Sequence, residues 1–357
     1  MDRQNYAYTH LNIVSMNTIV KLSSHERSLY CRQAVERMEF PLPAAVIEKD
    51  FWVCWILHLL NAIPELKGNI TFKGGTSLSK AWGLIDRFSE DIDIAINRRV
   101  FGQQPPFGVE DAETNRQKKK RLKELETKSA VFIKEFLFPK LQEEISKHVK
   151  PEEFSLRLIE KGNEVNIEFE YPGVLKSELG GLLPVVLIEF VPRADEVPNE
   201  ERIITPILYE VFSDILGEGS FVISTLVPER TFLEKLLLIH ETLEGFNKGS
   251  ERKSRHYYDL QKLYNVGVFN LVMNNHELFQ MVVQHRQLFF RYNTLDYAGI
   301  LNNGVRLTPT AGKLAAWRGD YMRTAVMIFK DQPAFDDLML FASQLENEFN
   351  EWILSTR

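Results

Sequence analysis

One stretch of the sequence, FKGGTSLSKAWGLIDRFSEDIDIAI at residues 72–96, constrains the fold of this chain more than any other. The NITF segment that leads into it predicts a short strand, which would end at a turn through Gly74 and Gly75. The alternation in DIDIAI predicts a second strand, and a period of two places Asp91 and Asp93 on one face of it. The residues between predict a short helix. The expected order is therefore strand, glycine turn, helix and a strand that carries two carboxylates.

This order indicates a site for a metal-bound nucleoside triphosphate. Two carboxylates held this close repel each other, and Mg²⁺ (or Mn²⁺), which prefers carboxylate and phosphate oxygens, relieves the repulsion. The glycines let the backbone approach a phosphate, and the helix start, capped by Thr76 or Ser77, offers unpaired N–H groups. A Gly-Gly pair or an Asp-x-Asp segment alone is weak evidence, whereas their combination is much more specific. We expect Asp91 and Asp93 to hold the metal, and the expected nucleotide-binding residues are Lys73, Gly74, Gly75, Thr76, Ser77 and Ser89.

Composition limits the class of protein. The 357 residues are 44% hydrophobic and 26% charged, which is typical of a globular chain with two domains or one elaborated domain. Cys31 and Cys54 lack metal-ligand spacing and predict a reducing compartment. Because no apolar run reaches the roughly 18 residues of a membrane span and no signal peptide is recognisable, we expect a cytoplasmic protein without a membrane partner. The net charge of −6 argues against a protein that coats nucleic acid and allows only a local basic contact.

The secondary-structure pattern changes near residue 225. Before this point helices and strands are mixed: residues 44–60 predict a helix, and EVNIEFEY and LPVVLIEFV predict strands. After it, nearly every segment has a helical pattern. We therefore expect an α/β (α+β) domain with a mixed sheet over residues 1–225, which carries a charged helical insertion at about 98–150, and a helical domain over residues 226–357.

The strand, Gly-Gly, helix and Asp-x-Asp order resembles the signature of the DNA polymerase β-like nucleotidyltransferase superfamily and, more closely, that of the AbiEii/AbiGii toxin family. The resemblance extends to IEKDFWVCWIL, PERTFLEKLLLIH, RKSRHYYDLQKLY and GDYMRTAVMIF, and is weakest at about residues 98–165. It implies a polymerase β-like nucleotidyltransferase domain, use of an NTP with Mg²⁺, and the role of toxin in a type IV toxin-antitoxin or abortive-infection system. Members with an assigned activity act on RNA, notably on tRNA 3′ ends, so the implied partners are an NTP, an RNA acceptor and a cognate antitoxin encoded nearby.

The superfamily places a third metal carboxylate on a later strand. Glu189 is the leading candidate because an acid within VVLIEFV would be costly to bury without a partner, and a metal would remove that cost. The alternative is that Glu189 lies on the exposed face of an edge strand. Glu168 and Glu170 are weaker candidates, since alternation in that segment is also what a solvated strand face produces.

The helical half supplies further candidates. Lys235 stands next to an apolar run and needs a partner there, for which the triphosphate and Asp259 are the two options. Arg255, Asp259 and Lys262 share one face of a predicted helix, which by itself is typical of an ordinary salt-bridge stripe. With the family resemblance, we interpret Lys235 and Asp259 as catalytic and Arg255 as nucleotide-binding.

Two charged segments have an ordinary interpretation and a functional one. Glu48, Lys49 and Asp50 are expected to form the polar face of a helix, and the resemblance also allows Lys49 or Asp50 to face the cleft. The RQKKKR run at residues 116–121 is typical of a solvated helix face, and it would also suit contact with an RNA backbone.

The predicted function is metal-dependent transfer of an NMP from an NTP to an acceptor, with RNA, and specifically tRNA, as the acceptor that the resemblance implies. Two alternatives share the same site. One is a nucleotidyltransferase that modifies a small molecule of the antibiotic type, and the other is a non-catalytic nucleotide-binding module.

Overall fold

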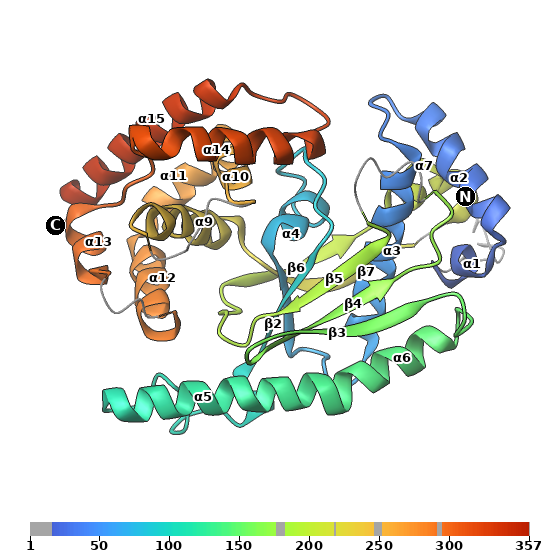
Figure 1. Ribbon diagram of the computed structural model, residues 1–357, viewed down its shortest axis with the longest axis horizontal. Coiled ribbons are helices and arrows are strands. Elements are labelled where there is room, and N and C mark those ends of the chain that lie inside the picture. The colour runs from blue at the N-terminus through green and yellow to red at the C-terminus, as the bar shows by residue number, and fades with distance from the viewer. Residues whose placement is uncertain (1–15, 176–182, 218, 246–251, 291–294, 357) are drawn as a thin grey trace, which may run out of the picture.

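A mixed seven-stranded sheet forms the centre of the protein (Figure 1). The computed structural model describes residues 16–175, 183–217, 219–245, 252–290 and 295–356. The strands are β1 (Ile70–Lys73), β2 (Ile92–Ile96), β3 (Ser155–Lys161), β4 (Glu164–Glu170), β5 (Val185–Phe190), β6 (Asn199–Ile204) and β7 (Phe221–Leu226). Their order is β3-β4-β5-β2-β1-β7-β6, with β2 parallel to β5, β1 parallel to β7 and the other neighbours antiparallel. The predicted α/β class with a mixed sheet is confirmed.

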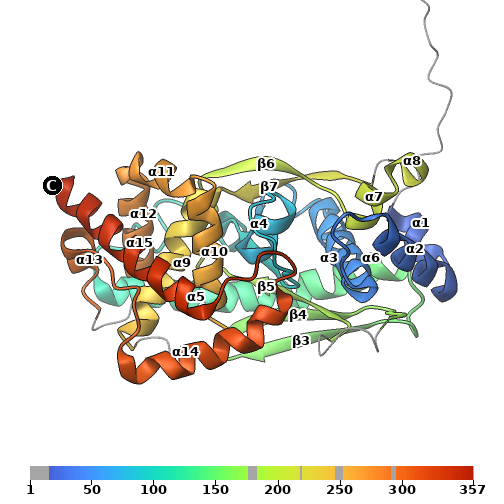
Figure 2. The same ribbon diagram turned by 90° about the horizontal axis from the view of Figure 1, so that it is seen from above.

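Helices surround this sheet, and those of the last third of the chain gather on one side of it (Figures 1 and 2). The helices before residue 225 are α1 (Met16–Lys21), α2 (Ser24–Arg37), α3 (Ala44–Ala62), α4 (Gly74–Lys80), α5 (Asn115–Val131), α6 (Phe138–Ser146), α7 (Ile207–Val211) and α8 (Ser213–Leu216), with a 3₁₀ turn at Arg98–Phe101 and a π-helical turn at Phe132–Leu137 between α5 and α6. Those after it are α9 (Pro228–Leu243), α10 (Arg255–Asn265), α11 (Val268–Met273), α12 (His276–Phe289), α13 (Tyr297–Asn303), α14 (Ala311–Thr324), a 3₁₀ turn at Ala325–Met327 and α15 (Phe335–Ser355).

Two hydrophobic cores hold these layers together. The first joins the sheet to α1, α2, α3, α5 and α6, and the second lies among helices α9 to α15. Among the buried residues that form these two cores, three cross between the two halves of the chain. Leu78 of α4 and Ile85 of the following loop pack in the second core, and Phe289 of α12 packs in the first. These crossing contacts fix α9 to α15 against the end of the sheet where β1 passes into α4.

The glycine turn differs from the expectation in one detail. Helix α4 begins at Gly74 itself with Lys73 as N-cap, and no side chain caps it, so the predicted cap at Thr76 or Ser77 is wrong. The hydroxyl of Ser77 instead donates to Gly74 O at 3.0 Å, and the Thr76 hydroxyl donates to Asp91 O. Both hydroxyls therefore tie the turn to itself and to the neighbouring strand.

Helix α3 corrects a second expectation. Glu48, Lys49 and Asp50 do not form a solvated face, because all three are at least 97% buried. Each has its own partners: Glu48 accepts from the backbone N–H groups of Val174 and Leu175, Lys49 pairs with Glu90, and Asp50 pairs with Lys80 at 2.9 Å. A helix packed on several sides buries its charged residues wherever neighbouring elements supply the opposite charge or backbone donors.

Candidate active site

The site is organised by a row of three residues that crosses three neighbouring strands. Lys73 at the end of β1 lies opposite Asp93 of β2, and Asp93 lies opposite Glu189 of β5. Apolar residues beside them on each strand point into the core: Phe72, Ile92, Ile94, Ile188 and Phe190 are buried. Because side chains alternate along a strand, burial of these neighbours turns the polar row to the opposite face. The alternative placement of Glu189 on an edge strand is wrong, since β5 lies inside the sheet.

A hollow of about 270 Å³ opens over this row, between the sheet and the helical half of the chain. Its wall contains most residues that the sequence pointed to: Gly74, Gly75, Ser89, Asp91, Asp93, Glu189, Lys235 and Arg255. Four predicted residues are not part of that wall: Thr76, Ser77 and Asp259 are buried behind it, and Lys73 pairs with Glu234. The hollow therefore brings together residues of α4, β2, β5, α9, α10 and α12 that are up to 212 positions apart in the chain, from Gly74 to Arg286.

The glycine turn fits closely against the carboxylates. Gly74 has φ of +77°, in the left-handed region, and a Cβ at this position would collide with the carboxylate of Asp93. A Cβ at Gly75 would lie 2.6 Å from Nη2 of Arg87 and 2.8 Å from Oγ of Ser89. Only glycine leaves the backbone bare beside Asp93, so a ligand on the carboxylates can also meet the N–H groups of this turn.

The carboxylates of the hollow repel one another. Burial, with the charges of Glu90 and Asp93, raises the pKa of Asp91 above its usual range. Burial, the charge of Asp93 and a hydrogen bond between the two carboxyl groups raise the pKa of Glu189 to about 8. Such crowding of like charges favours any cation that can sit between them.

A divalent cation fits this donor set if the protein supplies some of its ligands and the substrate supplies the others. No three His, Cys, Asp or Glu side chains among the described residues are arranged to hold a metal by themselves. Mg²⁺ commonly takes one or two carboxylates and completes its octahedral shell with water and substrate phosphates. Asp91 and Asp93, with Glu189 beside them, match that mode of binding.

Two basic side chains of the helical half face the carboxylates. Lys235 of α9 is 7% exposed and donates to Asp259 at 2.8 Å, and burial lowers its pKa. Arg255 of α10 also lines the hollow, and its Nε is buried without a hydrogen-bond partner among the described residues. An orphaned guanidinium nitrogen in a hollow lined with glycines marks a place where an anion such as phosphate would be bound.

Asp259 supports the site from behind. It is completely buried, and its two oxygens accept from Nε and Nη2 of Arg87 at 2.6 and 2.8 Å, in addition to the bond from Lys235. Burial alone would raise the pKa of this carboxyl, but the attraction of Arg87 and Lys235 outweighs it and holds the pKa well below its usual range. Asp259 therefore positions two cations at the hollow and does not itself face a ligand.

The structure adds residues that the sequence did not single out. Arg87 lines the hollow, and Arg252 approaches Asp91 at 3.7 Å and Glu90 at 3.5 Å. Glu234 of α9 pairs with Lys73 at 2.8 Å, which turns Lys73 toward the helical half. Arg87 and Arg252 could have been noticed in the sequence, because each lies within a segment already quoted for the family resemblance. Their partners could not be predicted, because these depend on how distant segments pack in the folded chain.

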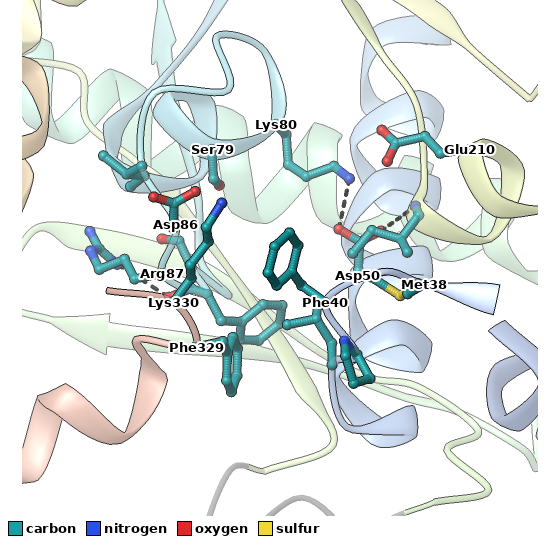
Figure 3. Close-up of a pocket in the computed structure, with 16 residues that line it drawn as sticks. Met38, Phe40, Asp50, Ser79, Lys80, Asp86, Arg87, Glu210, Phe329 and Lys330 are labelled. Carbon is teal, nitrogen blue, oxygen red and sulfur yellow. Dashed lines mark hydrogen bonds and ion pairs between the residues drawn. The ribbon is translucent and has the colours of Figure 1, made fainter. Parts of the chain in front are cut away.

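A second hollow lies on the other side of Arg87 and Ser89 and is not the catalytic candidate. It has a volume of about 450 Å³ and is lined by aromatic and charged side chains, among them Phe40, Phe329 and Lys330 (Figure 3). It contains neither the glycine turn nor any of the three carboxylates. Although this hollow is larger than the first, it lacks the groups of the first that suit a metal and a triphosphate.

The sequence matches the family described as "Nucleotidyl transferase AbiEii toxin, Type IV TA system" over residues 58–340. The chain belongs to this family. The AbiEii match spans both halves of the chain and includes all the predicted site residues, from Lys73 to Asp259. The resemblance drawn from the Gly-Gly and Asp-x-Asp segments is thereby confirmed.

Among solved structures, the AbiEii-family chain is similar to MenT4, a nucleotidyltransferase toxin of Mycobacterium tuberculosis. The two are 16% identical, the match covers 93% of this chain and 99% of that one, and the TM-score is 0.39. No curated protein matches the sequence. Among the described helices, none is both long and apolar enough to cross a bilayer.

Proposed function

We propose that the chain transfers an NMP from an NTP to a hydroxyl group of RNA, with the 3′ end of tRNA as the acceptor and Mg²⁺ or Mn²⁺ as the cofactor. The observation that carries the proposal is the row of Asp93 and Glu189 on paired strands beside the bare backbone of Gly74. Family membership supports nucleotidyl transfer and the role of toxin in a type IV system with a cognate antitoxin. The cytoplasm, where tRNA and NTPs are abundant, is the proposed location.

The residues that line and support the hollow have separate roles in the proposed reaction. Asp91 and Asp93, assisted by Glu189, would hold the metal, which supplies Lewis-acid stabilisation of charge at the α-phosphate. The N–H groups of the Gly74–Gly75 turn would hold the β- and γ-phosphates together with Arg255. Lys235, held by Asp259, would stabilise the charge that develops on the transferring group.

The reaction balances without a further co-reactant. The acceptor oxygen forms a bond to the α-phosphorus while the bond from that phosphorus to the bridging oxygen of the β-phosphate breaks. Pyrophosphate leaves, and the proton of the acceptor hydroxyl passes to water. The products are an NMP-modified acceptor and pyrophosphate.

One incubation distinguishes the proposed acceptor from its alternatives. The protein is mixed with each α-labelled NTP in turn, Mg²⁺ and total tRNA, and label is then measured separately in RNA, protein and small molecules. We expect label in RNA that disappears with EDTA and with tRNA whose 3′-terminal diol has been oxidised by periodate. Label in a small molecule would replace the RNA acceptor by an antibiotic-type one, and nucleotide binding without any product would indicate a non-catalytic module.

A further inference from the structure

A neighbouring hollow meets the catalytic one at Glu189. It has a volume of about 420 Å³ and lies among α5, β4, β5 with the segment after it, α9 and the end of α12. The two hollows share Glu189, Leu238 and Arg286, while Gly74 and Gly75 line only the catalytic one. The glycine turn and this neighbouring hollow, hereafter the side hollow, therefore lie on different sides of the carboxylates.

This arrangement fixes the direction from which an acceptor can come. In phosphoryl transfer the attacking and leaving oxygens lie roughly in line on opposite sides of phosphorus. With the leaving pyrophosphate on the Gly74–Gly75 turn, the attacking hydroxyl has to enter from the Glu189 side. The side hollow is the space that opens on that side.

The lining of the side hollow suits a nucleoside. Phe290, at the end of α12, is half-buried, and the guanidinium of Arg286 lies 4.7 Å from its ring centroid. Arg286 is itself held by a buried ion pair with Glu241. The amide oxygen of Asn166 accepts from Phe190 N at 3.1 Å, which leaves the NH₂ group of that side chain to donate. An aromatic ring and a fixed amide donor are the groups by which proteins stack and hydrogen-bond an unpaired base.

A line of cations leads away from the side hollow along α5. Glu126 of α5 lines the hollow, and Lys123 and Lys119, three and seven residues before it, share its face of the helix. Both lysines are exposed, and neither has an ion pair within the described part of the chain. Lys119 lies roughly 10 Å from Glu126 along the helix axis. This is the arrangement that a polyanionic strand needs if its last nucleoside occupies the hollow.

We propose that the side hollow and the Lys119–Lys123 face of α5 together form the binding track for the single-stranded 3′ end of the RNA acceptor. The terminal nucleoside stacks on Phe290 beside Asn166, and the preceding phosphates contact Lys123 and Lys119. The inference rests on the proposed nucleotidyl transfer and adds the path of the acceptor. Outside the hollow, the exposed lysines of α5 favour a polyanionic RNA over a polycation such as an aminoglycoside.

Two variants test the two parts of the track. Phe290→Leu keeps an apolar side chain and removes the ring, so KM for RNA should rise roughly tenfold or more while KM for the NTP stays constant. The double variant Lys119→Ala, Lys123→Ala should weaken binding of a fluorescein-labelled single-stranded RNA. It should also reduce the slope of log K against log salt by roughly 1.4, about 0.7 for each lost contact.

Lys147 and Lys150 provide the matched control. They are exposed lysines that, unlike Lys119 and Lys123, pair with nearby glutamates, and they follow α6, which the π-helical turn separates from α5; neither lines the side hollow. Lys147→Ala, Lys150→Ala should leave both RNA affinity and its salt slope unchanged. If both double variants changed the slope of log K against log salt equally, the effect would come from overall charge and not from the track, and the proposal would be overturned.

A crosslink then locates the terminal nucleoside directly. RNA that ends in 4-thiouridine, irradiated with the wild-type protein, should crosslink to the peptide that contains Phe290 or to residues 190–193. A crosslink at Phe40 or Phe329 would move the acceptor to the hollow of Figure 3 and overturn the track while leaving transfer to RNA intact. If the wild-type protein neither labels nor binds RNA, the proposed function and the track fall together.

Discussion

Lys235 and Asp259 form a buried ion pair of 2.8 Å that joins helices α9 and α10 at the back of the candidate active site. The same carboxylate accepts two bonds from Arg87, so loss of Lys235 leaves Asp259 with a bidentate partner. Because Asp259 keeps Arg87 as a partner, the effect of Lys235 on stability can be measured separately from its proposed effect on catalysis.

The first prediction concerns Lys235→Met, which keeps most of the stem and deletes the charge. Because Arg87 still satisfies Asp259, we expect unfolding free energy to fall by only about 1–2 kcal/mol, below the usual cost of breaking a buried pair. The transfer rate should fall by about 10² to 10³, the scale for losing one electrostatic contact to the transferring group. Both quantities are measured on one preparation, and a destabilised variant with full activity per folded molecule would remove Lys235 from the catalytic residues.

The second prediction concerns Asp91→Asn and Asp93→Asn. Each change removes one of the crowded carboxylates, so the melting temperature without metal should stay constant or rise. Transfer should be abolished, and the increase in melting temperature that Mg²⁺ with a non-hydrolysable NTP gives the wild type should be lost. Ser146→Ala, on the exposed surface of α6, serves as a neutral control. Wild-type turnover in either variant would contradict the metal assignment.

The third prediction compares two glycines with similar backbone angles. Gly74 and Gly83 have φ of +77° and +63°, but a Cβ would collide with Asp93 at the first and meet nothing within 4 Å at the second. Gly83→Ala should lower the unfolding free energy by about 1–2 kcal/mol, because it adds only the strain of an alanine in the left-handed region. Gly74→Ala should cost more and abolish NTP binding, as followed by urea unfolding and by titration with the nucleotide. Equal costs and intact binding would mean that the turn tolerates displacement of Asp93.

The fourth prediction is a pH dependence that belongs to Glu234. Burial alone would raise its pKa, but the charges of Lys73 and Arg230 outweigh burial and lower the pKa to about 2. A lowered folded-state pKa stabilises the protein fully above the unfolded value near 4.5 and loses this contribution as pH falls toward 2. The Glu234 side chain is 18% exposed, so solvent screens part of its charge, and its contribution to the unfolding free energy is about 2 kcal/mol. Glu234→Gln should flatten the stability curve between pH 5 and 2 by that amount, whereas Glu277→Gln, on the exposed face of α12, should not.

Several parts of the fold could be predicted from local pattern, and others could not. The strict alternation of DIDIAI and of EVNIEFEY identified β2 and β4 because one face of each strand is buried. Strands β3, β6 and β7 were missed. Strands β3 and β6 lie at the two edges of the sheet and carry charged or exposed residues at most positions, so their sequences show no buried face. Strand β7 lies inside the sheet, between β1 and β6, and its burial does alternate over most of its length.

The sequence by itself determined the chemical elements of the site. The order of glycine turn, helix and Asp-x-Asp follows from a few residues, since glycine allows the left-handed turn and extended backbone places residues two apart on the same face. The identity of Glu189 as the neighbour of Asp93 required the register between β2 and β5, which are almost 100 positions apart. Local propensity contains no information about which distant strand pairs with which.

Only the tertiary structure decided which charged residues face the hollow and which support it. The sequence of α3 predicted an exposed polar face at Glu48, Lys49 and Asp50, and the folded chain buries all three against partners from other elements. Asp259 in the same way became a support for Lys235 and Arg87 behind the hollow. The physical reason is that a charge can be buried only where its counter-charge arrives, and that arrival depends on the packing of elements far apart in the chain.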